Sequence, residues 1–203
     1  MEQLRILAMV GGISKNSINK KLFVAMKHHA PLGVKLEYFD ISELPFFSQD
    51  IEHEPPRKVK EFKELITQSD AVLFITPEYN RSIPGVLKNA IDWASRPYGE
   101  NLWDKLPAGV MGCSVGNTGT LGSQQHLRQV LGYLNMAVMG QPEFYLNASH
   151  VFDEHGTLVD TKTKEHIEKY WDSFVHWINF VAPEQEAFRA MPEDDSTQSS
   201  LNH

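Results

Sequence analysis

Apolar runs alternate with amphipathic stretches along most of this chain. The apolar or alternating runs predict strands over Leu4–Val10, Val34–Phe39, Ala71–Thr76, Ala108–Val115 and Val138–Leu146. Apolar residues recur at helical spacing in the stretches between and after them, which predict helices over Asn19–Ala30, Pro55–Gln68, Pro84–Ala94, Gln124–Met136 and Lys162–Val181. This regular alternation predicts an α/β domain with a parallel sheet and helices on both faces.

Five strands in this order match the flavodoxin-like form of the doubly wound fold, with strand order 2-1-3-4-5. Gly140 and Pro142 interrupt the last run, so its strand is expected to be irregular. We assign residues 1–182 to this single domain. Residues 183–203 are rich in Glu, Asp, Ser and Gln, and we predict an acidic tail that is mobile or lies on a partner subunit.

Composition narrows the function. A chain of 203 residues with 41% hydrophobic residues is large enough to bury a core, and its net charge of −7 disfavours nucleic acid or an anionic membrane as partner. The sequence has no signal peptide and no apolar run near the roughly 20 residues that span a bilayer, so we expect a cytoplasmic protein. Cys113 is the single cysteine, which argues against a disulfide or a cysteine-ligated metal site; we expect it to be a buried small hydrophobe and predict no metal.

In doubly wound sheets, ligands bind beyond the carboxyl ends of the strands, where the strand order reverses. The reversal predicted here brings together a first loop (residues 11–19), a second loop (77–82) and a third loop (114–122). The first loop combines small and hydroxyl residues with the start of a helix, which is typical of a phosphate site. Its candidate contacts are Gly12, Ser14, Ser17 and Asn19, with Lys15 as a cation. The alternative is an ordinary capped turn.

The first loop lacks the glycine and lysine spacing of nucleotide-binding P-loops and of dinucleotide folds, which favours a terminal monophosphate. In the second loop, Pro77, Glu78, Tyr79 and Asn80 offer an aromatic face and backbone groups to a planar ligand, although a rigid turn is the simpler interpretation. The third loop is rich in glycine and polar residues, and Ser114 and Gly116 are its candidate contacts. A flexible loop without a role is the alternative there.

The string TPEYNRSIPGVLKNAIDW at residues 76–93 resembles the signature of the NADPH-dependent FMN reductase family, and the likeness extends from Leu4 to about Val181. The family's first loop reads G-S-x-R-x-x-S-x-N. Gly11, Ser17 and Asn19 match this pattern, whereas Gly12 replaces its serine and Ser14 its arginine. The resemblance therefore supports Ser17 and Asn19 as phosphate ligands, with Lys15 replacing the cation that the missing arginine provides in the family.

The resemblance implies FMN as cofactor and NADPH or NADH as electron donor. It implies ping-pong hydride transfer through flavin N5 to small acceptors such as quinones, azo compounds, metal oxyanions or free flavin, with no catalytic side chain. It also implies a homodimer or homotetramer. Arg81 is a candidate for docking the dinucleotide phosphates or for an ion pair between subunits, and His126 is expected to pack or to lie at a subunit contact. An FMN-binding electron carrier or regulatory module is the alternative function.

Overall fold

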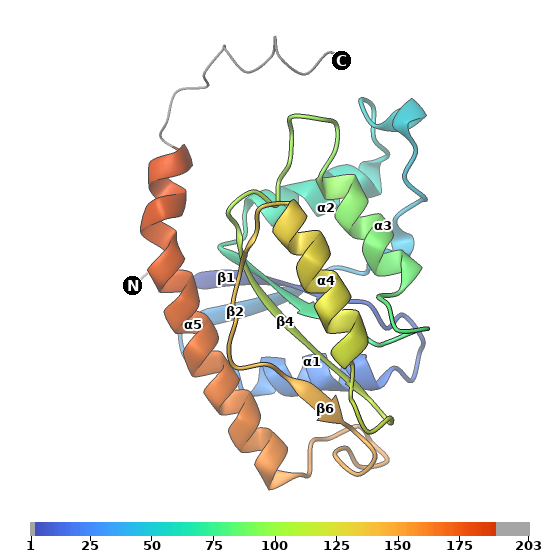
Figure 1. Ribbon diagram of the computed structural model, residues 1–203, viewed down its shortest axis with the longest axis vertical. Coiled ribbons are helices and arrows are strands. Elements are labelled where there is room, and N and C mark those ends of the chain that lie inside the picture. The colour runs from blue at the N-terminus through green and yellow to red at the C-terminus, as the bar shows by residue number, and fades with distance from the viewer. Residues whose placement is uncertain (1–2, 190–203) are drawn as a thin grey trace.

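The strands form a parallel sheet with helices packed against it (Figure 1), and strand β1 (Leu4–Val10) lies in it between β2 (Val34–Tyr38) and β3 (Ala71–Ile75). The structure is a computed structural model that describes residues 3–189, with side chains described to residue 182. Its strands are β1 (Leu4–Val10), β2 (Val34–Tyr38), β3 (Ala71–Ile75), β4 (Pro107–Ser114), β5 (Ala137–Val138) and β6 (Tyr145–Asn147). Its helices are α1 (Ile18–His28), α2 (Arg57–Thr67), α3 (Gly85–Ala94), α4 (Leu121–Tyr133) and α5 (Thr161–Arg189), with short 3-10 helices η1 (Ile41–Glu43) and η2 (Gln49–Ile51).

The sheet order is β2-β1-β3-β4-β5, which confirms the predicted flavodoxin-like order. All pairs are parallel, so the carboxyl ends of β1, β3 and β4 meet at one edge of the sheet. The strand order reverses between β1 and β3, because the chain continues outward from β1 to β2 and then returns to the other side of β1. The fold therefore brings the three candidate loops to the same edge.

The fifth position of the sheet is shared by two short strands, and here the sequence prediction was incomplete. β5 pairs with Pro107 and Ala108 at the start of β4, whereas β6 pairs with residues 112–114 at its end. Between them the chain leaves the sheet around Gly140 and Pro142. The single strand predicted over Val138–Leu146 is therefore two strands, because proline cannot donate to the ladder and glycine adds little to hold a strand.

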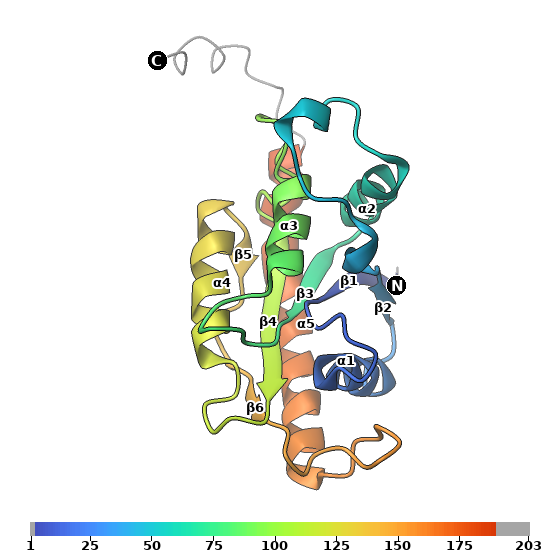
Figure 2. The same cartoon turned by 90° about the vertical axis from the view of Figure 1, so that its right-hand side faces the viewer.

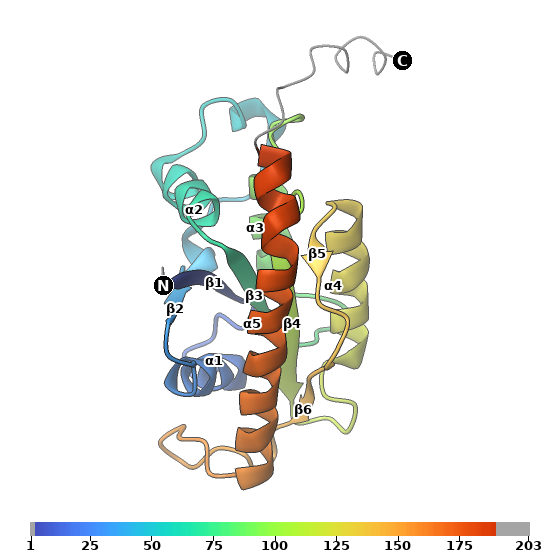
Figure 3. The ribbon, with the colours of Figure 1, turned by 90° about the vertical axis from the view of Figure 1, so that its left-hand side faces the viewer.

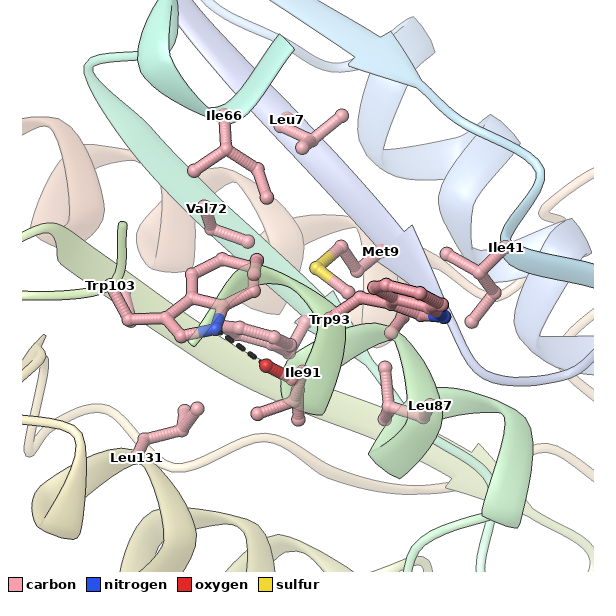
Figure 4. Packing of buried hydrophobic residues seen from close by; sticks show 14 of the residues in the cluster. Leu7, Met9, Ile41, Ile66, Val72, Leu87, Ile91, Trp93, Trp103 and Leu131 are labelled. Carbon is pink, nitrogen blue, oxygen red and sulfur yellow. Dashed lines mark hydrogen bonds between the residues drawn. The ribbon is translucent and has the colours of Figure 1, made fainter. Parts of the chain in front are cut away.

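Helices cover both faces of the sheet. Helices α2, α3 and α4 pack on one face, and α1 and α5 pack on the other (Figures 2 and 3). Alternate strand residues serve the two layers, as with Met9 on the first face and Ala8 on the second. Figure 4 shows the first layer around two buried tryptophans, where Nε1 of Trp103 donates to the carbonyl of Ile91 over 2.9 Å. This bond satisfies the indole N–H inside the core.

Helix α5 is longer than predicted. It continues to Arg189, past the proposed domain boundary at residue 182. The segment Glu184–Phe188 contains Glu, Gln and Ala, which favour helix, although its polar composition suggested a tail. The remainder of the predicted tail, residues 190–203, lies outside the described residues. Among residues 3–189, no helix combines the length and the apolar character that crossing a membrane would take.

Candidate functional site

The first and second loops pack against each other at the carboxyl edge of the sheet. The amide of Gly11 donates to the carbonyl of Ile75 at the end of β3 over 2.9 Å. A Cβ on Gly11 would lie 3.2 Å from side-chain atoms of both Pro77 and Pro84. Glycine therefore allows the first loop to approach Pro77 in the second loop and Pro84 at the start of α3.

The first loop has the geometry of an anion-binding turn. Ser17 is the N-cap of α1, and the amides of Ile18 and Asn19 behind it have no acceptor among the described hydrogen bonds. The side chains of Ser14 and Lys15 are exposed, and no hydrogen bond or ion pair of theirs occurs within the described chain. Free amides at a helix N-terminus next to hydroxyl groups fit a phosphate group.

Gly12 shapes this turn by leaving room for Ser17. A Cβ at position 12 would lie 2.2 Å from Oγ of Ser17, so any side chain there would force the serine hydroxyl to rotate. Ser17 Oγ instead points back into the loop, where it accepts weakly from the amide of Lys20 at 3.4 Å. Its hydroxyl proton stays available to a ligand.

Asn19 has a structural task that the sequence did not reveal. Its side chain is 1% exposed, Nδ2 donates to the carbonyl of Cys113 at 3.0 Å, and Oδ1 accepts from the amide of the same residue at 3.1 Å. Asn19 therefore fastens the start of α1 to the end of β4. Its contact with a phosphate stays a prediction, with its backbone amide and one side-chain N–H left for it.

Cys113 itself is fully buried, as predicted. Burial raises the pKa of its thiol to about 12, because the thiolate would lose its hydration. The thiol is therefore protonated at neutral pH, and the residue behaves as a small apolar side chain.

The second loop is a tight turn with its own hydrogen bonds. Tyr79 and Ser82 exchange backbone hydrogen bonds of 3.0 Å in each direction. Asn80 and Arg81 between them have φ values of 52° and 64°, the left-handed pair that a two-residue turn of this kind requires. The carbonyl of Pro77 accepts from the hydroxyl of Ser123 at 3.0 Å. The second loop is predicted to contact a ligand through its backbone. Of its amides, those of Glu78 and Asn80 have no acceptor in the described chain.

The side chain of Glu78 joins the second loop to helix α4. Its Oε2 accepts from the amide of Ser123 in the first turn of α4 at 3.1 Å, and its Oε1 accepts from Nη1 of Arg81 at 3.3 Å. The helix N-cap, Thr120, makes no side-chain capping bond of its own. A carboxylate at this position accepts from an amide that has no partner within the helix, and its negative charge is stabilised by the helix dipole. The carboxylate of Glu78 is thus engaged within the protein.

The third loop is closed by Ser114. Its Oγ donates to the carbonyl of Gly119 at 2.6 Å and accepts from the amide of Gly116 at 3.1 Å. The structure thus brings the two predicted residues of this loop together, and they bind each other. Residues 115–118, between Ser114 and Gly119, are exposed.

Each of the three loops also exposes a large apolar side chain outside the helices. These are Ile13 in the first loop, Tyr79 in the second and Val115 in the third. Exposed apolar side chains on loops that also present polar backbone groups suit a site for a planar organic ligand. We call these three residues the apolar rim.

Sequence reasoning missed several supporting residues on α4 and α1. Gly122 allows Glu78 to approach the helix, since a Cβ there would lie 3.1 Å from Oε2. His126, which was expected to pack or to lie at a subunit contact, is exposed in the single chain, and its Nδ1 lies 2.8 Å from Oγ of Ser82; the subunit contact stays a prediction. Lys20 places Nζ 3.1 Å from the carbonyl oxygen of Ile13. In the sequence, the signal for Lys20 was its position three residues after Ser17, the N-cap of α1.

Comparison with known proteins decides the family. A family model described as NADPH-dependent FMN reductase matches residues 4–151. The chain belongs to this family. The predictions of an FMN-using, NAD(P)H-dependent oxidoreductase with a flavodoxin-like fold are thereby confirmed.

Relatives of this FMN reductase family member match over nearly their full length. A 2-hydroxy-1,4-benzoquinone reductase from Burkholderia sp. is 40% identical over 176 residues, which cover 86% of this chain and 96% of the relative. A quinone reductase from Pseudomonas putida is 42% identical over 175 residues, covering 85% and 94%. The flavoenzyme FerB of Paracoccus denitrificans, an NAD(P)H:(acceptor) oxidoreductase, is 38% identical with a TM-score of 0.82, covering 87% of this chain and 98% of FerB.

The bonds of Asn19 lead to a stability prediction. Asn19→Ala is expected to lower the free energy of unfolding of the flavin-free protein by about 2–4 kcal/mol, because it leaves the buried amide and carbonyl of Cys113 unpaired. Urea unfolding measures this loss. Asn16→Ala, at an exposed position of the same loop, is the control and should change stability by less than about 0.5 kcal/mol. Wild-type stability combined with lost FMN affinity in Asn19→Ala would instead show a direct ligand.

Proposed function

We propose that this FMN reductase family member holds FMN across the three loops, takes electrons from NADPH or NADH and reduces small planar acceptors, quinones first among them. The candidate site has a polar part and an apolar part, and this division supports the placement. Free amides and hydroxyls gather at the N-terminus of α1, and the apolar rim spans the three neighbouring loops. A flavin mononucleotide has the same division into a phosphate and a planar ring.

The residues fit this cofactor at both ends. At the phosphate end, the amides of Ile18 and Asn19 and the hydroxyls of Ser14 and Ser17 are the donors. At the ring end, the free amides of the second loop face a ligand with a polar edge, while the apolar rim keeps water from a ring bound there. When bound, FMN supplies the redox chemistry, accepting a hydride from the nicotinamide and passing two electrons to the acceptor.

Quinones are the favoured acceptor class because both curated relatives described above are named quinone reductases. A quinone is planar and largely apolar, which suits the rim. Azo compounds, metal oxyanions and free flavin remain secondary candidates. The cytoplasmic location stays a prediction.

Anaerobic reduction tests this function. One equivalent of NADPH should bleach the visible absorbance of the FMN-loaded protein, and one equivalent of a benzoquinone should restore it. Flavin titration should show FMN bound more tightly than FAD, since the first loop offers donors for a single phosphate. Tight FMN binding without reduction by NADPH or NADH would favour the electron carrier, and the absence of flavin binding would contradict both functions.

Arg81 is proposed to dock the phosphates of the nicotinamide dinucleotide. Its side chain is 79% exposed, and its ion pair with Glu78 is a solvent-exposed one that adds little stability. The left-handed turn projects the guanidinium from the second loop, where it is available for the planar, two-point contact that phosphates favour. The subunit ion pair remains the competing role.

Arg81→Ala should therefore raise the KM for NADPH about threefold to tenfold at constant FMN content, as expected for one exposed charge-assisted contact. Steady-state kinetics with saturating quinone measures it. Arg57→Ala removes an equally exposed arginine that pairs with Glu61 on α2, and it should leave KM unchanged. An unchanged KM in Arg81→Ala, together with dissociation into monomers, would assign the residue to an interface.

A homodimer or homotetramer is proposed from the way Phe46 is held. The carbonyl of Pro45 accepts from Nδ2 of Asn89 at 2.9 Å and from Nε1 of Trp93 at 2.8 Å, while the amide of Phe47 donates to Oδ1 of Asn89 at 2.8 Å. Phe46 lies between these fixed residues and is 88% exposed. A rigid, exposed aromatic side chain is typical of an interface anchor.

Phe46→Ser should shift the protein toward smaller species in sedimentation velocity at micromolar concentration, because the truncated residue no longer fills a pocket on the second copy. Leu32→Ser is the matched control, since Leu32 is fully exposed in the turn between α1 and β2 and no hydrogen bonds within the described chain hold it. A wild-type protein that sediments as a monomer would contradict the proposed assembly.

A further inference from the structure

We infer that Lys20, and not Lys15, provides the cation that balances the FMN phosphate. This inference rests on the proposed placement of the phosphate on the first loop. The observation behind it is the path of the Lys20 side chain, which turns back from the first turn of α1 so that Nζ lies 3.1 Å from the carbonyl oxygen of Ile13. The ammonium group is thereby held beside the loop before any ligand binds.

The other two lysines near the loop are placed differently. Lys15 is exposed at the tip of the first loop, where no hydrogen bond or ion pair within the described chain fixes its side chain. The methylene groups of Lys21 lie against Gly156, and its Cε is 3.3 Å from the position that a Cβ of residue 156 would occupy. A free lysine loses side-chain entropy when it orders on a ligand, whereas Lys20 has already lost much of it.

The single bond to Ile13 leaves Lys20 with donors to spare. An ammonium group has three N–H bonds, and one of them is directed at the Ile13 carbonyl. No other acceptor for it occurs among the described residues. The remaining donors and the full positive charge are thus available to an anion on the loop.

The positive charge of Lys20 also acts on the carboxylate of Asp40. Asp40 caps η1 through Ser42, whose hydrogen bonds chiefly lower the pKa of the Asp40 carboxyl, and the positive charge of Lys20 lowers this pKa further. Asp40 is therefore ionised at neutral pH, and its charge interacts with that of Lys20. The charge of Lys58 also lowers the pKa of Asp40, so Lys20 shares the screening of the carboxylate while it attracts the anion.

Titration of the flavin-free protein with FMN and with riboflavin tests this inference. In low salt, Lys20→Met is expected to weaken FMN binding about tenfold, and Lys20→Arg should retain most of the affinity. Riboflavin lacks the phosphate, so its affinity should not change. At about 1 M salt, where the screening length falls to about 3 Å, the FMN difference should shrink to about twofold.

Three further variants sharpen the test. Lys21→Met is the matched control and should bind FMN as the wild type does. Lys15→Met should lose less affinity than Lys20→Met. Adding Asp40→Asn to Lys20→Met should recover a small part of the lost affinity, because the carboxylate that Lys20 helped to screen is then gone.

The outcomes separate the inference from the proposed function. Equal FMN affinity in Lys20→Met and wild type, or a larger loss in Lys15→Met, would overturn the role of Lys20. An equal loss for riboflavin and FMN would show that Lys20 supports the loop structure instead. A wild-type protein that binds riboflavin as tightly as FMN would contradict the phosphate site itself.

Discussion

Two hydrogen bonds between Asn19 and the backbone of Cys113 hold the site together. They join the first turn of α1 to the end of β4, across residues that are 94 positions apart in the chain. Because the first loop immediately precedes α1 and the third loop immediately follows β4, the bonds set the distance between both loops. A buried carboxamide that satisfies both polar groups of one residue is well suited to this task, since any shift of α1 would leave two groups unpaired. The first loop, on which we propose that the phosphate binds, is thus positioned by the protein core.

The second loop is also held in place by hydrogen bonds within the protein. Its turn closes on its own backbone bonds, and Glu78 and the carbonyl of Pro77 are both engaged with Ser123 on α4. The loop therefore needs no ligand to hold its shape, and the amides that remain free are presented by a preformed structure. Preformed sites avoid the ordering cost of binding. Tight retention of a cofactor through many turnovers is compatible with such a site.

The layered α/β fold could be predicted from the sequence because buried parallel strands appear as continuous apolar runs. The meeting of the three candidate loops at one edge could be predicted as well, since parallel strands place all their carboxyl ends there. The break between β5 and β6 was only partly visible, in Gly140 and Pro142. The pairing of Asn19 with Cys113 and of Glu78 with Ser123 could not be predicted, because each joins residues that only the tertiary fold brings together. The same holds for Lys20, whose side-chain direction no pattern in the first loop encodes.

Gly12 has a consequence for how the first loop is compared with related loops. Position by position, glycine here looks like the loss of a hydroxyl group that the family pattern provides. In space, the oxygen of Ser17 lies where a side chain of residue 12 would begin. Ser17 belongs to the family pattern too, so the hydroxyl group that the pattern has at position 12 is missing here, and the rotamer of Ser17 uses the space that a side chain at position 12 would need. A serine introduced at position 12 would therefore have to be accompanied by a different rotamer of Ser17, so the effect of either residue on the loop depends on the other.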